Sequence, residues 1–174
     1  MTVDLSLPRA AWSEHPNYPN QTLLLRSHRS FRETSSWLSA RAARGEPRAA
    51  LLASFAWWKG AMHGHERYEE GKLYPYLEHR WGLSCADLTA GHAALADADA
   101  RVRSARGDAL SEALDVHHAL LMAHLDAEER RVIPALLELG GDEFVTYTEN
   151  GRGWLMRTVA CYAGASGCRW CTRS

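Results

Sequence analysis

The sequence predicts an all-α protein, an antiparallel up-down-up-down four-helix bundle with an N-terminal arm and a C-terminal appended segment. Two observations carry this prediction. Four long runs with apolar residues at a helical period follow one another through short connections, at residues 20–43, 48–80, 84–107 and 108–140. Strand signals are absent from the first 140 residues, apart from isolated valines.

The 174 residues are expected to form one bundle domain at 20–141, with the arm at 1–19 and the appended segment at 142–174. A formal net charge of −1 argues against a broad basic surface for nucleic acid or anionic lipid. No run approaches the length of a membrane span, and the N-terminus lacks the features of a signal peptide. We therefore expect a cytoplasmic protein with neither nucleic acid nor membrane as a partner.

The first 19 residues indicate an extended arm that lies against the body of the protein. Prolines interrupt the stretch, and its aromatic residues Trp12 and Tyr18 favour burial. The first helical run follows and breaks at Gly45-Glu46-Pro47. The inward face of this run combines apolar residues with one histidine, and consists of Leu24, His28, Phe31, Ser35 and Leu38.

The second run, residues 48–80, is predicted to be one helix despite its glycines, with bends near Gly60 and before Pro75. Its inward face carries Trp58, Met62, His65, Glu69 and Tyr76. A variant capping box at Ser84-Cys85-Ala86-Asp87 is expected to open the third run, which places His92 in its apolar stripe. Asp108 is expected to cap the fourth, whose inward face presents Leu114, His117, Leu121, His124, Glu128 and Val132.

A repeated pattern links the second and fourth runs. The segment 124–136 matches the segment 65–77 without a gap at the histidine, both glutamates, the proline and the final leucine. Residues four apart on a helix share a face, about 6 Å apart along the axis. Each His-x-x-x-Glu can therefore offer one imidazole and one carboxylate to a single point.

Six inward polar side chains would then meet at the centre of the bundle: His28, His65, Glu69, His92, His124 and Glu128. Buried ionised carboxylates need partners, and two of them with four imidazoles call for cations. Mixed nitrogen and oxygen ligation suits iron, manganese or zinc, and two carboxylates able to bridge imply a pair of metals. A single His-x-x-x-Glu is more often a surface hydrogen-bonded pair, but two repeats in register favour metal binding.

This pattern resembles that of the bacterial hemerythrin-like, or HHE cation-binding, proteins, which carry His, His-x-x-x-Glu, His and His-x-x-x-Glu on four successive helices. The resemblance covers about residues 20–139 and extends to Glu70, Glu129, Pro75 and Pro134. It implies two iron ions joined by an oxo or hydroxo bridge. Manganese or zinc, which the donor types also suit, is less favoured. It would assign His28 and His65 to one iron, His92 and His124 to the other, and Glu69 and Glu128 to the bridge.

Two departures from the oxygen-carrying hemerythrins shape the functional hypothesis. Ala96 stands where those proteins have a second histidine on the third helix, and the last motif is His-x-x-x-Glu rather than His-x-x-x-x-Asp. With four imidazoles for two irons, each metal would keep an open position. We expect sensing, storage or a redox response to oxygen, peroxide or nitric oxide rather than reversible oxygen carriage. The alternatives are a di-iron enzyme of unassigned catalytic residues, and a structural bundle with incidental histidines.

Other residues leave several interpretations open. His117 reads as a core histidine, one that supports a ligand, or an additional ligand, and Tyr68 or Tyr74 as an additional ligand or a redox-active tyrosine. The ending, Cys161 with Cys168-Arg169-Trp170-Cys171, is compatible with a redox dithiol, half of a zinc site or a structural tail. A redox partner could act through Cys168 and Cys171.

Overall fold

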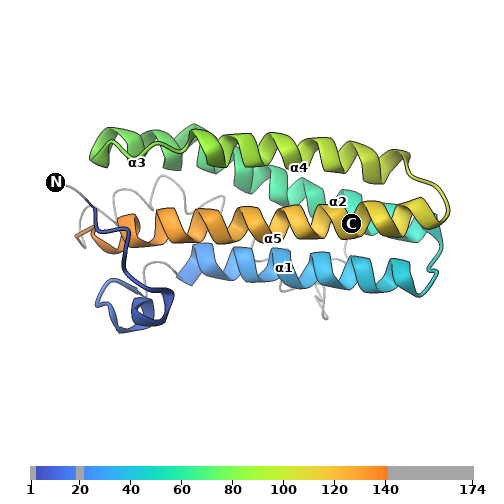
Figure 1. The fold of residues 1–174 in the computed structure, drawn as a ribbon, viewed down its shortest axis with the longest axis horizontal. Helices are drawn as coiled ribbons and strands as arrows, with labels where there is room; N and C mark the ends of the chain where they lie inside the picture. The colour runs from blue at the N-terminus through green and yellow to red at the C-terminus, as the bar shows by residue number, and fades with distance from the viewer. Residues whose placement is uncertain (1–2, 19–21, 141–174) are drawn as a thin grey trace, which may run out of the picture.

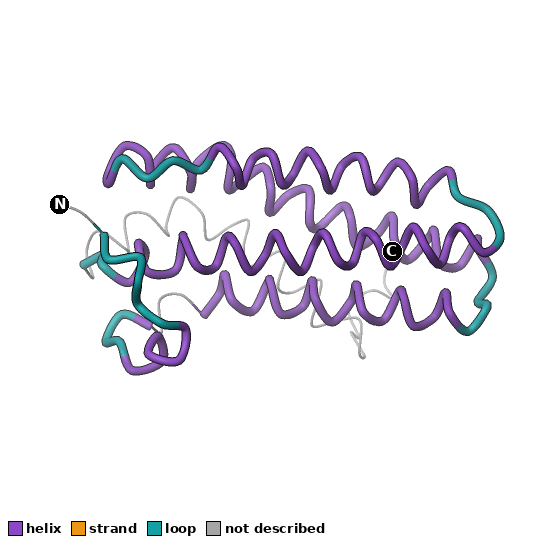
Figure 2. Tube along the Cα trace, in the orientation of Figure 1, coloured by secondary structure: helices purple, strands orange, loops and turns teal. Residues whose placement is uncertain are grey.

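Four long helical runs lie side by side in the computed structural model, which describes residues 3–18 and 22–140 (Figures 1 and 2). Successive runs point in opposite directions, as the colour gradient of Figure 1 shows, so the predicted antiparallel all-α bundle is confirmed. The helices are α1 (Thr22–Ala43), α2 (Arg48–Tyr68), η3 (Glu69–Leu73), α3 (Tyr74–Trp81), α4 (Ala86–Ser104) and α5 (Asp108–Leu137).

The second run is continuous from α2 to α3, but one π-helical turn, η3, interrupts its regular geometry. In this turn the backbone N–H of Tyr74 donates to the carbonyl of Glu69, five residues earlier. Pro75 cannot donate a backbone hydrogen bond, and its ring would crowd the carbonyl four residues before it, so a wider turn relieves that contact. The π turn begins at Glu69, one of the predicted ligands.

Two apolar clusters fill the core. One surrounds Trp12, Leu77 and Ile133, and the other surrounds Phe55 and Trp58. On every helical run the predicted ligands stand where the chain passes from one cluster to the other, as His92 does between Leu88 and Leu95. The bundle therefore has a polar layer between two apolar ends.

The N-terminal arm packs against the bundle, as expected from its aromatic residues, but it is not extended throughout. It forms a short 3₁₀ helix, η1 (Arg9–Glu14), in which Trp12 is buried. The Asn17 side chain donates hydrogen bonds to the carbonyls of Leu137 and Leu139, at 2.7 and 2.9 Å. These bonds hold the arm against the C-terminal end of α5.

The two predicted N-caps are wrong. The residues that precede α4 and α5 are Cys85 and Gly107, and neither makes a side-chain capping bond. Asp87 forms an ion pair with Arg131 of α5 instead. Gly107 has a positive φ of 55°, which suits a glycine at the turn between the two helices.

Two further expectations concern membrane spans and the C-terminal segment. No helix among residues 3–18 and 22–140 is long and apolar enough to cross a membrane. The appended segment 142–174, with Cys161, Cys168 and Cys171, lies outside the described residues.

Candidate metal centre

The six predicted ligands come from all four helical runs and are all buried. His28, Glu69 and Glu128 are 0% exposed, His65 is 3%, His92 is 7% and His124 is 9% exposed. They lie on α1, on α2 with η3, on α4 and on α5. The helical periodicity thus placed each of them correctly on an inner face, and their role as ligands stays a prediction.

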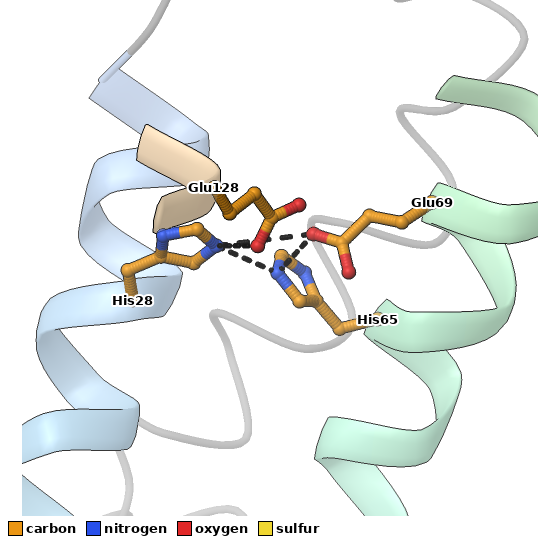
Figure 3. Close-up of side chains that lie close together, drawn as sticks. All are labelled: His28, His65, Glu69 and Glu128. Atoms are coloured by element: carbon orange, nitrogen blue, oxygen red, sulfur yellow. Dashed lines mark hydrogen bonds and ion pairs between the residues drawn. The ribbon is translucent and has the colours of Figure 1, made fainter. Parts of the chain in front are cut away.

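Four of these residues converge on one point, as Figure 3 shows. Nitrogen or oxygen atoms of His28, His65, Glu69 and Glu128 all lie within 4.8 Å of one another. The Nε2 atoms of His28 and His65 are 3.0 Å apart. Two metal–nitrogen bonds of about 2.1 Å at a right angle would put their nitrogens about 3 Å apart, so the spacing suits neighbouring ligands of one ion.

The remaining histidines form a second pair beside the first. The rings of His92 and His124 are 4.5 Å apart between centroids. Glu69 directs Oε1 to His65 Nε2, at 2.6 Å, and Oε2 to His92 Nε2, at 3.5 Å. Glu128 Oε2 lies 3.5 Å from His28 Nε2 and 3.7 Å from His124 Nε2. Each carboxylate therefore faces both histidine pairs, which is the arrangement that a bridging carboxylate needs.

The inner atoms of this cluster fit a cation. Buried polar atoms are normally hydrogen-bonded, and one left without a partner costs about 1–3 kcal/mol. Here several buried atoms that can donate a lone pair make no hydrogen bond: Glu69 Oε2, Glu128 Oε2, His92 Nε2 and His124 Nε2. A metal ion is the species that could satisfy these oxygens and nitrogens together.

The outer atoms, in contrast, are held by hydrogen bonds. His28 Nδ1 lies 3.1 Å from Glu129 Oε1, and His92 Nδ1 lies 2.8 Å from Glu70 Oε1. The second glutamate of each repeat thus reaches a histidine on another helix. A carboxylate at Nδ1 holds the ring with its Nε2 lone pair directed inward, as in many metal sites.

The comparisons with known proteins agree with this geometry. The family model described as Hemerythrin HHE cation binding domain matches residues 21–136. The chain belongs to this family. The bundle is the hemerythrin fold, and it contains a buried His/Glu cluster that could hold metal. Neither the curated proteins nor the solved structures yielded a significant match.

In the HHE domain the pKa values of the two central carboxylates are shifted in opposite directions. Burial and the nearby charge of Glu69 raise the pKa of Glu128 well above its ordinary value. Burial alone would also raise the pKa of Glu69, but the charge on His65 and the close imidazoles of His28 and His92 hold it well below its ordinary value. Glu69 is thus ready as an anion, whereas Glu128 must release a proton to bind a cation.

The two histidines of the second pair also differ. Burial alone would lower the pKa of His92, but Glu69 and Glu70 raise it to about 9. Burial and the adjacent charge of His92 lower the pKa of His124 to about 4. His124 is therefore neutral at pH 7, the form that binds metal, whereas His92 must lose a proton.

Tyr74 is the tyrosine that the structure brings to the centre. Its hydroxyl donates to Glu128 Oε1 at 2.9 Å, and its ring stacks on that of His92 with centroids 5.9 Å apart. Burial and the charges of Glu128 and Glu69 raise the pKa of Tyr74 far above its ordinary value, so the hydroxyl keeps its proton. Tyr68, which the sequence left as an equal candidate, is only half-buried.

Gly91 is a site residue that the sequence analysis missed. A Cβ added there would overlap Nδ1 of the His124 ring. Only glycine lets the α4 backbone approach this imidazole so closely. A glycine inside a helix, directly before an inward histidine, was the signal available in the sequence.

Two expectations about neighbouring residues are resolved. His117 does not belong to the centre: its Nε2 pairs with Asp99 Oδ1 at 2.9 Å, and its ring packs against Phe55 and Trp58. Ala96, expected to mark a vacancy beside the metals, is exposed. Leu95 instead lines the small cavity of about 10 Å³ at the centre.

Proposed function

We propose that this protein is a non-haem di-iron hemerythrin-like protein that binds or reacts with oxygen, peroxide or nitric oxide for sensing, storage or a redox response. One observation carries the proposal. Each of the carboxylates of Glu69 and Glu128 faces both histidine pairs, and their inner atoms are buried without a hydrogen bond. Two cations bridged by these carboxylates would satisfy both pairs.

Each residue would have a defined role in holding the metals. His28 with His65 would bind one iron, His92 with His124 would bind the other, and Glu69 and Glu128 would bridge them. Two irons would supply redox chemistry and open coordination positions. Nitrogen and oxygen donors without a thiolate support iron, with manganese or zinc as the competing metals. Cys85, the one cysteine among the described residues, does not line the central cavity.

The surroundings of the centre favour a small ligand. The central cavity of about 10 Å³ is close to the minimum for one water molecule. Its apolar wall consists of Phe31, Met62, Leu95, Leu121 and Leu125. Such a wall excludes bulk water and leaves room for a diatomic molecule or peroxide only after small side-chain movements.

Metal content is the first test. Purified protein, loaded with Fe(II) without oxygen and then oxidised, should hold about two irons per chain and show the near-ultraviolet charge-transfer band of an oxo-bridged pair. His65→Ala combined with His124→Ala removes one imidazole from each pair and should abolish the band. Fewer than one metal per chain, unaffected by the double substitution, would refute the proposal. Competition with Mn(II) and Zn(II) identifies the preferred metal.

An enzyme remains the second candidate, and Tyr74 is the observation that favours it. An oxidisable phenol is buried against both Glu128 and His92, which is where an electron donor would serve an oxygen- or peroxide-consuming reaction. Reduced protein should be mixed with limiting oxygen or peroxide in the presence of excess reductant. Many turnovers per chain indicate an enzyme, whereas a stable adduct or a single stoichiometric oxidation indicates a sensor or store.

A further inference from the structure

The two halves of the centre have different supports behind their histidines. Glu129, which holds His28, has a side chain that is 1% exposed, whereas Glu70, which holds His92, is 42% exposed. The two glutamates occupy the same place in the repeated motif, so their sequence context gives no reason to expect this difference. It arises from what packs around them.

Two arginines clamp Glu129. Arg32 of α1 donates to Oε1 at 2.6 Å, and Arg9 of η1 contributes Nη2 at 2.7 Å from Oε2. Both arginines also reach Asp126, one turn earlier on α5, at 2.7 and 3.6 Å. Within the described residues, Glu70 pairs with no arginine or lysine. The Arg32–Glu129 hydrogen bond is charge-assisted, and such bonds are about twice as strong as neutral ones. Arg9 adds an ion pair at Oε2.

Arg9 comes from outside the region that matches the family, residues 21–136. The arm that carries it is anchored by buried Trp12 and by the hydrogen bonds of Asn17 to the end of α5. An exposed ion pair of an arginine as open as Arg9, 59% exposed, usually contributes little. Here, however, its partner Glu129 is a buried carboxylate that holds the buried ring of His28. An ion pair that restrains Glu129 therefore also restrains His28.

We infer that Arg9 of the N-terminal arm, together with Arg32, fixes Glu129 and through it His28, so that the His28–His65 half binds its metal more tightly than the His92–His124 half. Arg9 is thus a positioning residue for the centre. This inference rests on the proposed two-metal function. A ring held by a fixed acceptor keeps its Nε2 lone pair aimed at the metal and loses less freedom on binding.

Cobalt(II), used alone as the probe, tests this asymmetry in the full chain. Excess chelator should remove cobalt from the loaded wild type in two phases of one ion each. Arg9→Gln should accelerate the slow phase by about tenfold, within the range of about 10–100-fold that such supporting residues contribute. The fast phase should not change, because Glu70 and His92 keep their contacts.

Matched variants assign the phases. Glu129→Gln should accelerate only the slow phase, and Glu70→Gln only the fast phase. Arg29→Gln, which breaks an exposed pair with Glu33 on the same helix as Arg32, should change neither. A loss of fold stability alone would accelerate both phases together, so selectivity separates positioning from a general structural role.

Three results would overturn the inference. Removal of both cobalt ions at one rate from the wild type would show that the halves are equivalent. A slow phase unchanged in Arg9→Gln would show that the arm does not support His28, while leaving the proposed function intact. A wild type that takes up less than one cobalt, manganese, zinc or iron per chain would refute the proposed function and the inference with it.

Discussion

Gly91→Ala is the substitution that most directly tests the geometry of the centre. In an ordinary helix this change is stabilising, by roughly 0.5–1 kcal/mol, because alanine has the higher helix propensity. At position 91 the added Cβ would overlap Nδ1 of the His124 ring. Forcing an extra carbon into a packed interior costs about 1–3 kcal/mol. The overlap therefore offsets the propensity gain or exceeds it, and we expect a net loss of up to about 2.5 kcal/mol.

The His124 ring cannot relieve this overlap without consequence. It lies against His92, and its Nε2 faces Glu128. Rotation away from the new methyl group would move Nε2 from the point that it shares with Glu128. We therefore expect metal uptake to fall from about two ions to about one per chain, with the His28–His65 half retained.

Urea unfolding of the metal-free protein and metal analysis of the loaded protein measure these two effects. Gly60→Ala is the matched control, because Gly60 lies in α2 and has no neighbouring atom within 4 Å of an added Cβ. It should raise stability by about 0.4–1 kcal/mol and leave metal uptake unchanged. If Gly91→Ala behaved like this control in both assays, the close approach of α4 to His124 would be refuted.

Three other predictions follow from buried polar contacts. Tyr74→Phe removes the hydroxyl that donates to Glu128 and should lower the free energy of unfolding by about 1–3 kcal/mol, measured in urea. Asp99→Ala removes the partner of His117 and leaves buried Lys59 with Glu66 as its remaining partner. It should cost about 3 kcal/mol without changing metal stoichiometry, and a loss of metal would contradict the conclusion that His117 and Asp99 lie outside the metal centre. Burial alone would raise the pKa of Glu129, but His28 and Arg32 lower it to about 2, from an ordinary 4.5. The stability that ionised Glu129 contributes is therefore complete above pH 4.5 and is lost as the pH falls towards 2. The loss is at most about 3 kcal/mol, and less where solvent screens the charge. In Glu129→Gln, urea titrations at different pH values should no longer show this part of the acid dependence.

Much of the fold, and the set of side chains on the inner helix faces, could be predicted from the pattern of residues along each helix. A helical period places residues such as His65 and Glu69 on one face wherever the helix packs, and short connections make neighbouring helices antiparallel. The repeated motif then brought polar residues of different helices to the same level. For these features no knowledge of the contacts between helices was needed.

The predictions that were wrong concern local details that the backbone decides at single positions. The π turn at Glu69–Leu73 widens the helix before Pro75, whereas α5 continues through Pro134 as an α-helix. The same motif therefore adopts two backbone geometries, and its residue types do not distinguish them. Ala96 was expected beside the metals because it matches the second histidine that oxygen-carrying hemerythrins have on the third helix, but the side of α4 that it occupies is exposed.

By itself the sequence determined the four helices, their order and the six inward polar residues, because these depend on periodicity along one chain. Only the tertiary structure decided how closely α4 approaches His124 at Gly91, and that Glu129 and Glu70 reach across to histidines of other helices. It also decided that Arg9 of the arm closes on Glu129. Such contacts depend on the rotation and spacing of packed helices, which no period within a single helix specifies.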